Sequence, residues 1–202
     1  MLKIYPDKGY AFEDGEPMVY ADSYFDRYSR MAETPIGKAL NNFRSSLVSK
    51  YCDSIIDIGI GDGAFLKKFP GRGLGYDVCE KAENWLKSQN RWADPYESFP
   101  DVEAISFWDS LEHIKDPTLI LDKIPHDAFV FFSLPIFSDI TKITESKHYR
   151  PWGEGGGTEH YHYFNKEGFV EFLKLSGFEI IEILDEEMKI GREDILTFVA
   201  KK

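Results

Sequence analysis

Cysteine is scarce in this sequence. Cys52 and Cys79 are the two cysteines among 202 residues, too few for a disulfide framework and without the spacing of a zinc site. The β-branched runs beside them predict that Cys52 enters one strand and Cys79 leaves its neighbour, so the two lie at opposite edges of a sheet. We expect two reduced thiols.

Long hydrophobic runs are also absent. No stretch approaches the roughly 18 apolar residues of a membrane-spanning helix, and the first residues, "MLKIYPDKGYAF", lack the apolar core of a secretory signal. We therefore expect a cytoplasmic protein without a membrane span.

Basic residues are outnumbered. Lysine and arginine total 24 against 35 aspartates and glutamates, a formal net charge of −11, which argues against broad, sequence-independent attraction to a phosphate backbone. One segment is locally basic and is interpreted as a solvated helix face. Its basic residues are Arg27, Arg30, Lys38, Arg44 and Lys50. If these residues form a local basic patch, a nucleic acid or a protein stays open as a partner.

What the sequence does contain is an alternation of short β-branched or aromatic runs with helical segments, which predicts an α/β fold with a parallel sheet and helices on both faces. The predicted strands are residues 54–58, 73–78, 103–108, 128–134, 178–184 and 195–200, with a weak strand near 91–93. The predicted helices are residues 34–51, 63–69, 80–88, 116–124 and 165–177. The last two strands predict an antiparallel hairpin around "GRED".

The length favours a single domain over residues 1–202. Within it, residues 1–50 are interpreted as an N-terminal cap and helix, and residues 54–202 as the α/β core. Residues 136–163 form a long aromatic insertion, which is typical of a lid or binding loop, with the glycine run 153–157 as its hinge or tip.

The most informative segment is "SIIDIGIGDGAF", residues 54–65. Gly59 and Gly61 allow a tight turn and a close approach to a ligand, and "GIGDGA" also fits the dinucleotide pattern G-x-G-x-x-A. Asp57 before the turn suits an ammonium group and would repel a pyrophosphate. Asp77, which ends the next strand, suits ribose hydroxyls. An ammonium group and a ribose without a pyrophosphate describe S-adenosylmethionine.

Two further segments extend this interpretation. "DIGIGDG" resembles the D-x-G-x-G-x-G motif of class I S-adenosylmethionine-dependent methyltransferases, and "FWDSLEHIKDP" and "EHYHYFNKEGFVEFLKLSGFEIIEI" resemble segments of their ubiquinone-biosynthesis-like branch, type 11/23. The resemblance implies a Rossmann-like, doubly wound sheet of seven strands with the last strand antiparallel. It also implies a set of cofactor-binding residues: Asp57, Gly59, Gly61, Asp77, Asp94, Phe107 and Trp108.

Histidines are the candidate catalytic residues, because transfer to a hydroxyl is helped by a base that removes its proton. His113 follows the strand at 103–108, whereas His160 and His162 lie in the insertion. In the ubiquinone-biosynthesis-like branch the stretch matching "DSLEH" reads E-x-x-E-H and is associated with a divalent metal. The corresponding ligands would be Asp109, Glu112 and His113, but aspartate is shorter than glutamate, and we expect no metal.

The sequence thus predicts an S-adenosylmethionine-dependent methyltransferase that acts on a small or medium acceptor, with O-methylation favoured over transfer to nitrogen or carbon. Two alternatives remain open. A nicotinamide-dependent oxidoreductase would use the same glycine turn, and a methyltransferase-like subunit without catalysis would keep the fold as a binding module.

Overall fold

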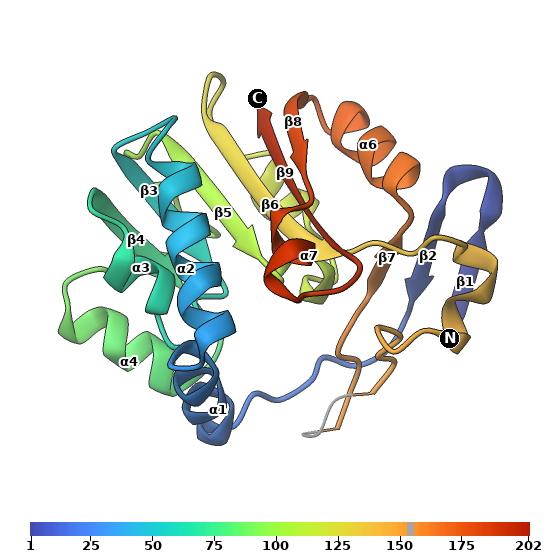
Figure 1. Ribbon diagram of the computed structural model, residues 1–202, viewed down its shortest axis with the longest axis horizontal. Coiled ribbons are helices and arrows are strands. Elements are labelled where there is room, and N and C mark those ends of the chain that lie inside the picture. The colour runs from blue at the N-terminus through green and yellow to red at the C-terminus, as the bar shows by residue number, and fades with distance from the viewer. Residues whose placement is uncertain (153–155) are drawn as a thin grey trace.

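A six-stranded sheet forms the centre of the computed structural model, which describes residues 1–152 and 156–202 (Figure 1). In spatial order the strands are β4 (Arg72–Tyr76), β3 (Ser54–Ile58), β5 (Ala104–Trp108), β6 (Phe129–Pro135), β9 (Ile195–Lys201) and β8 (Glu179–Leu184). Strands β4, β3, β5 and β6 pair in parallel, and β9 is antiparallel to both of its neighbours. The predicted Rossmann-like class and the closing antiparallel hairpin are confirmed.

The expected seventh strand, near residues 91–93, is reduced to one parallel bridge between Gly75 and Trp92. Asn90 has a positive φ of 53°, and Asp94 and Pro95 follow within five residues. Since none of these residues favours an extended strand, the ladder stops after a single bridge. The sheet has six strands where the resemblance implied seven.

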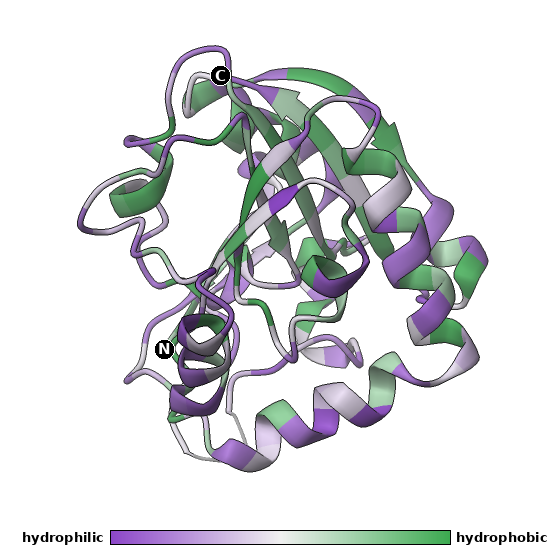
Figure 2. Ribbon diagram, turned by 90° about the vertical axis from the view of Figure 1, so that its left-hand side faces the viewer, coloured by the Kyte–Doolittle hydropathy of each residue, from purple (hydrophilic) through white to green (hydrophobic). Residues whose placement is uncertain are grey.

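Helices cover both faces of the sheet because its strands are apolar on both sides. Ile56 and Ile58 of β3 belong to one core cluster, whereas Ile55 belongs to the other. On the Ile55 side pack α2 (Pro35–Val48), α3 (Ala64–Lys68) and α4 (Glu80–Ser88), and on the other side α5 (Thr118–Leu121) and α6 (Lys166–Leu175). Figure 2 shows the hydrophobic strands inside and hydrophilic outer helix faces.

The predicted helix starts are borne out by side-chain caps. Thr34 Oγ1 accepts a hydrogen bond from Gly37 N at 3.1 Å, and Pro35 occupies the first turn of α2. At α6, Asn165 Oδ1 accepts from Gly168 N at 2.7 Å. Each cap joins residues three apart in the chain, which is why the sequence predicts where these two helices start.

A second, three-stranded antiparallel sheet was not predicted. The N-terminal hairpin of β1 (Leu2–Tyr5), the 3-10 helix η1 (Pro6–Lys8) and β2 (Tyr10–Glu13) pairs with β7 (His162–Phe164). This sheet lies beside the large one (Figure 1, right). The insertion also contains η3 (Ile140–Glu145). The hypothesis of a glycine hinge at 153–157 falls largely on residues 153–155, outside the described residues.

Two helical segments complete the fold at the carboxyl ends of the parallel strands. Helix α1 (Asp22–Ala32) precedes α2, and the 3-10 helix η2 (Leu111–His113) follows β5. A short helix, α7 (Glu186–Ile190), interrupts the predicted hairpin between β8 and β9.

Cys52 and Cys79 are both buried and free of disulfides. Among the described residues, no helix combines the length and apolar character that crossing a bilayer requires.

Candidate active site

The glycine turn after β3 has the backbone conformation that requires glycine. Gly59 and Gly61 have φ of 77° and 59°, a region that side-chain-bearing residues rarely adopt. A Cβ on Gly59 would lie 2.7 Å from Ser110 Cβ, and a Cβ on Gly61 would lie 3.2 Å from the ring of Tyr28. The turn is therefore packed between the β5–η2 loop and helix α1.

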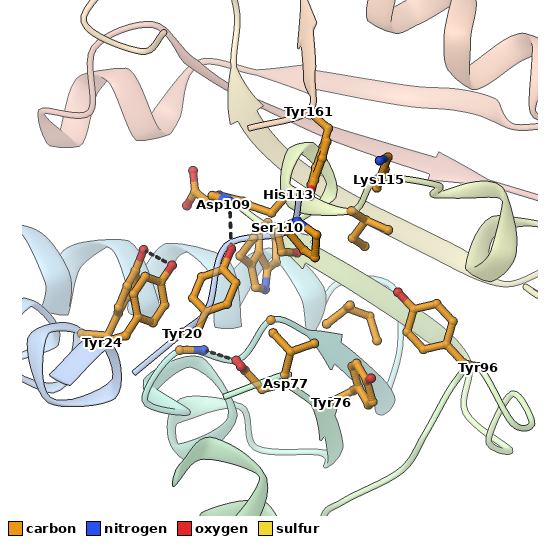
Figure 3. Close-up of a pocket in the computed structure, with 18 residues that line it drawn as sticks. Tyr20, Tyr24, Tyr76, Asp77, Tyr96, Asp109, Ser110, His113, Lys115 and Tyr161 are labelled. Carbon is orange, nitrogen blue, oxygen red and sulfur yellow. Dashed lines mark hydrogen bonds between the residues drawn. The ribbon is translucent and has the colours of Figure 1, made fainter. Parts of the chain in front are cut away.

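A cavity of about 290 Å³ opens where β3, β4 and β5 end. Figure 3 shows Asp77 and Tyr76 on one wall and Tyr20, Ser110 and His113 on the opposite wall. The lining residues not yet named are mostly apolar or aromatic: Pro17, Tyr24, Ile58, Val78, Tyr96, Trp108, Ile114 and Tyr161, with Asp109 and Lys115. An aromatic enclosure with few polar groups is typical of a site for a small organic ligand.

Asp77 is one of the two acidic residues that line this cavity, the other being Asp109. Its carboxylate accepts hydrogen bonds from Gly61 N at 3.1 Å and Cys79 N at 2.8 Å, which fix its orientation. Burial raises the pKa of Asp77 to about 6, and the backbone donors oppose that rise. An oriented carboxylate in an apolar cavity is suited to accept hydrogen bonds from a pair of ligand hydroxyls.

Asp57 lies in a second cavity of about 400 Å³, on the other side of the glycine turn. Its Oδ1 accepts a hydrogen bond from Ser106 Oγ at 2.7 Å, and burial raises the pKa of Asp57 to about 7. Both cavities are lined by Gly59, Gly61 and Trp108. One elongated ligand can therefore extend past the turn, with hydroxyls at Asp77 and a cationic group near Asp57.

Two of the residues expected to bind the cofactor lie elsewhere. Phe107 is fully buried in the sheet core and stacks on Phe132 with ring centroids 5.3 Å apart. Neighbours on a strand point to opposite faces, so Trp108 faces the cavities and Phe107 cannot. Asp94 is not among the cavity residues. Its Oδ1 accepts a hydrogen bond from Tyr96 N at 2.8 Å and stabilises a turn.

The sequence did not indicate which residues form the aromatic end of the cavity. Tyr76 and Tyr96 meet edge to face with centroids 5.4 Å apart, and Val78 and Ile114 lie beside them. Val78 follows Asp77 directly and Tyr96 follows Asp94 by two residues. The sequence therefore located the right segments but not the residues whose side chains face inward.

Two of the three candidate histidines come together. His113 lines the cavity, and its Nδ1 lies 3.3 Å from the hydroxyl of Tyr20. His160 packs edge to face against His113 with centroids 4.5 Å apart. Burial lowers the pKa of His113 to about 4 and places the pKa of His160 well below its usual value. Both imidazoles are therefore neutral at physiological pH.

His162 has a different environment. Its Nδ1 lies 2.8 Å from the hydroxyl of Tyr10, and its Nε2 lies 2.9 Å from the carbonyl oxygen of Ile114. With the Nε2 proton donated to that carbonyl, Nδ1 accepts from Tyr10 and both nitrogens are used. His162 does not line the cavity and instead joins the N-terminal hairpin to the loop after η2.

Asp109 is held by arginines and does not join Glu112 and His113. Arg192 donates to both of its carboxylate oxygens at 2.8 Å, and Arg44 donates to Oδ2 at 2.8 Å. These contacts hold the pKa of Asp109 far below its usual range even though the group is buried. Glu187 of α7 accepts from both arginines as well. Arg44, expected on a solvated face, is buried in this network.

The chain matches a known family over most of its length. A family described as a methyltransferase domain matches residues 20–183. The chain belongs to this methyltransferase family. The predicted class, an S-adenosylmethionine-dependent methyltransferase, is confirmed, and the oxidoreductase alternative is set aside. None of the curated proteins matches the chain.

Solved structures share the fold at low identity. A SAM-dependent methyltransferase from Archaeoglobus fulgidus is 16% identical, with a TM-score of 0.60, covering 90% of this chain and 100% of that one. Magnesium protoporphyrin IX methyltransferase from Synechocystis PCC 6803, solved with bound SAH, is 14% identical, with a TM-score of 0.61 and coverage of 90% and 95%. The glycopeptide N-methyltransferase MtfA, complexed with S-adenosylmethionine, is 11% identical, with a TM-score of 0.54 and coverage of 79% and 86%.

The residues of this methyltransferase fit the cofactor. Besides Asp57 and Asp77, the indole Nε1 of Trp108 and the hydroxyl of Ser110 are buried without a hydrogen-bond partner among the described residues. Both residues line the aromatic cavity of about 290 Å³. Since buried polar groups are rarely left unpaired, these two atoms indicate that a ligand with polar groups belongs between the two cavities.

Cofactor affinity should rise with pH because both buried carboxyls must ionise to bind their partners. With pKa values raised to about 7 for Asp57 and about 6 for Asp77, both are mostly protonated at pH 5.5 and mostly ionised at pH 7.5. We expect calorimetric titration to show S-adenosylmethionine binding on the order of 100-fold more tightly at pH 7.5 than at pH 5.5. The Asp57→Asn variant should show a flatter dependence. Affinity that falls with pH in the wild type would contradict the assignment.

Proposed function

We propose that this methyltransferase transfers the methyl group of S-adenosylmethionine to an oxygen atom of a small acceptor. The observation that carries the proposal is the placement of His113 on the wall of the cofactor cavity, backed by His160. Methyl transfer from a sulfonium is an in-line displacement that depends mainly on positioning. A hydroxyl acceptor additionally loses a proton, and His113 and His160 are the candidates to take it.

A small acceptor suits the enclosure of the site. Tyr20, Tyr24 and Tyr28 line the cavity from the N-terminal segment, and Tyr161 from the insertion. The hydroxyl of Tyr24 donates to that of Tyr28 at 3.0 Å, which joins two of these rings. Such a wall excludes water from the transferring methyl group and leaves room for a compact molecule.

A neighbouring cavity of about 390 Å³ favours acceptors that carry an anionic group. Tyr20 and Tyr24 separate it from the cofactor cavity, and its other lining residues include Arg27, Arg30 and Arg150 with one acid, Glu159. Guanidinium groups bind carboxylates and phosphates through paired hydrogen bonds. In a chain with a net charge of −11, this is a local basic site beside the cofactor cavity.

The proposal is tested by measuring S-adenosylhomocysteine released with a panel of hydroxylated small molecules, half of which carry a carboxylate or phosphate. With an acceptor found, His113→Asn should lower kcat about 100-fold or more, while the Kd for S-adenosylmethionine changes by less than about threefold. His148→Asn is the control, because His148 is a histidine of the insertion that lies outside the cavity and its substitution should leave kcat unchanged.

Two results would contradict parts of this proposal, and a third would favour an alternative to it. A kcat for His113→Asn within about threefold of the wild type would contradict the role of that histidine. A product methylated at nitrogen or carbon, identified by NMR, would contradict O-methylation. Tight cofactor binding with no turnover of any acceptor would favour the alternative of a methyltransferase-like binding subunit.

A further inference from the structure

Three potential metal ligands gather next to the cofactor cavity. One ligand atom each from Glu112, His113 and His160 lies within 4.8 Å of the others. Glu112 and His113 belong to η2, and His160 approaches from the insertion, where Tyr161 N donates to the Glu112 carbonyl at 2.8 Å. That hydrogen bond fixes the two segments side by side. Among the described residues, this is the one group of its kind.

Glu112 shows that the cluster is incomplete by itself. Its side chain is 2% exposed, and Oε2 has no hydrogen-bond partner among the described residues. Leaving a carboxylate oxygen buried and unpaired costs free energy. Neither adjacent imidazole makes a hydrogen bond to that oxygen. A bound cation would give it a partner.

The cluster differs from the ligand set that the D-x-x-E-H stretch implied. That set does not fit this structure, because both carboxylate oxygens of Asp109 are occupied by Arg44 and Arg192. His160, 47 residues beyond His113 in the chain, occupies the place of the third ligand. The cluster therefore offers one carboxylate and two imidazoles, whereas the implied set has two carboxylates and one imidazole.

We propose that Glu112, His113 and His160 bind a divalent transition-metal ion. Two imidazole nitrogens with one carboxylate favour ions such as Zn²⁺, Fe²⁺ or Co²⁺ over Mg²⁺, which prefers oxygen ligands. The donor atoms lie within 4.8 Å of one another, and ligands of one such ion each lie about 2.0–2.2 Å from it. Because His113 lines the cavity, the ion lies beside that cavity, where it would lower the pKa of an acceptor hydroxyl bound to it. In the metal-loaded protein His113 and His160 would therefore promote loss of the hydroxyl proton as ligands of the ion, and they act as free bases only in the metal-free protein.

Cobalt binding tests the proposal without methyl transfer. Protein stripped with a chelator is titrated with Co²⁺, and the visible absorption of the bound ion is recorded. We expect one Co²⁺ per chain with a Kd in the micromolar range or tighter, displaced by Zn²⁺ and not by millimolar Mg²⁺. His160→Asn and Glu112→Gln should each weaken binding at least tenfold, and His148→Asn should leave it unchanged.

Folding and cofactor binding are followed in parallel. Each variant is checked by thermal melting and by calorimetric titration with S-adenosylmethionine, which reports the cofactor site independently of the metal. Folded wild-type protein that binds the cofactor and takes up no Co²⁺ would overturn the metal site while leaving the proposed function intact. A His160→Asn variant with wild-type Co²⁺ affinity would also overturn it, because only the set proposed here contains that histidine.

Discussion

Asp77→Ala should weaken the binding of S-adenosylmethionine at least tenfold, a loss of about 1.4 kcal/mol or more. Asp77 is the one acid that both lines the aromatic cavity and is oriented by two backbone N–H groups, those of Gly61 and Cys79. A carboxylate fixed in this way accepts two hydroxyl hydrogen bonds without reorganising. Calorimetric titration of the wild type and the variant with S-adenosylmethionine and its demethylated product measures the effect.

Asp94→Ala is the matched control for this loss. Asp94 also follows a β-bridge at the same end of the sheet, but it caps a turn through Tyr96 N and does not line the cavity. We expect the Kd of the Asp94→Ala variant for S-adenosylmethionine to differ from the wild-type value by less than about threefold. Since Asp77 also holds the glycine turn, both variants are melted to verify that they are folded. A folded Asp77→Ala variant with wild-type affinity would show that the ribose lies elsewhere.

The sequence predicted the parts of the fold that depend on nearby residues. The cap of α2 uses Thr34, Pro35 and Gly37, which are adjacent in the chain. The β-branched runs predict the parallel strands and the closing hairpin for the same reason. The N-terminal hairpin was missed because its partner is distant: Tyr10 pairs with Phe164. Each strand of the hairpin has four residues, too few to indicate which distant segment it pairs with.

The residues that line the two cavities were predicted where a motif is local and missed where the orientation of the side chain decides. Asp57, Gly59, Gly61 and Asp77 line the two cavities as expected. The choice between Phe107 and Trp108 could have been made from strand periodicity, because residues 106 and 108 share a face and Ser106 pairs with Asp57. By contrast, the approach of His160 to His113 follows from the path of the insertion, which no short-range pattern reveals.

The buried charge network illustrates the same limit and carries the largest expected effect on stability. Arg44 of α2 and Glu187 of α7 are 143 residues apart, and their side chains meet at 2.9 Å, with Glu187 fully buried. Arg192 donates to Glu187 as well, at 2.6 Å. In sequence both look like ordinary surface charges. Removing one member leaves the others buried and incompletely paired, which costs about 3–5 kcal/mol.

Glu187→Gln should therefore lower the free energy of unfolding by about 3–5 kcal/mol, and the melting temperature by roughly 6–20 °C for a chain of this size. Urea denaturation and thermal melting measure the change. Glu83→Gln is the control, because Glu83 and Lys87 form an exposed i,i+4 pair whose loss costs about 0.5 kcal/mol. Equal effects of the two substitutions would show that the network adds no more than a surface pair.

The network also fixes the site, because Asp109 lines both cavities with a backbone φ of 54°. For a residue with a side chain this conformation is unfavourable, and it persists when surrounding contacts enforce it. Arg44 and Arg192 supply those contacts, and Glu187 holds both arginines in place. If the network serves this purpose, Glu187→Gln should weaken S-adenosylmethionine binding at temperatures where the variant is still folded. A destabilised variant with wild-type affinity would assign the four charges to folding alone.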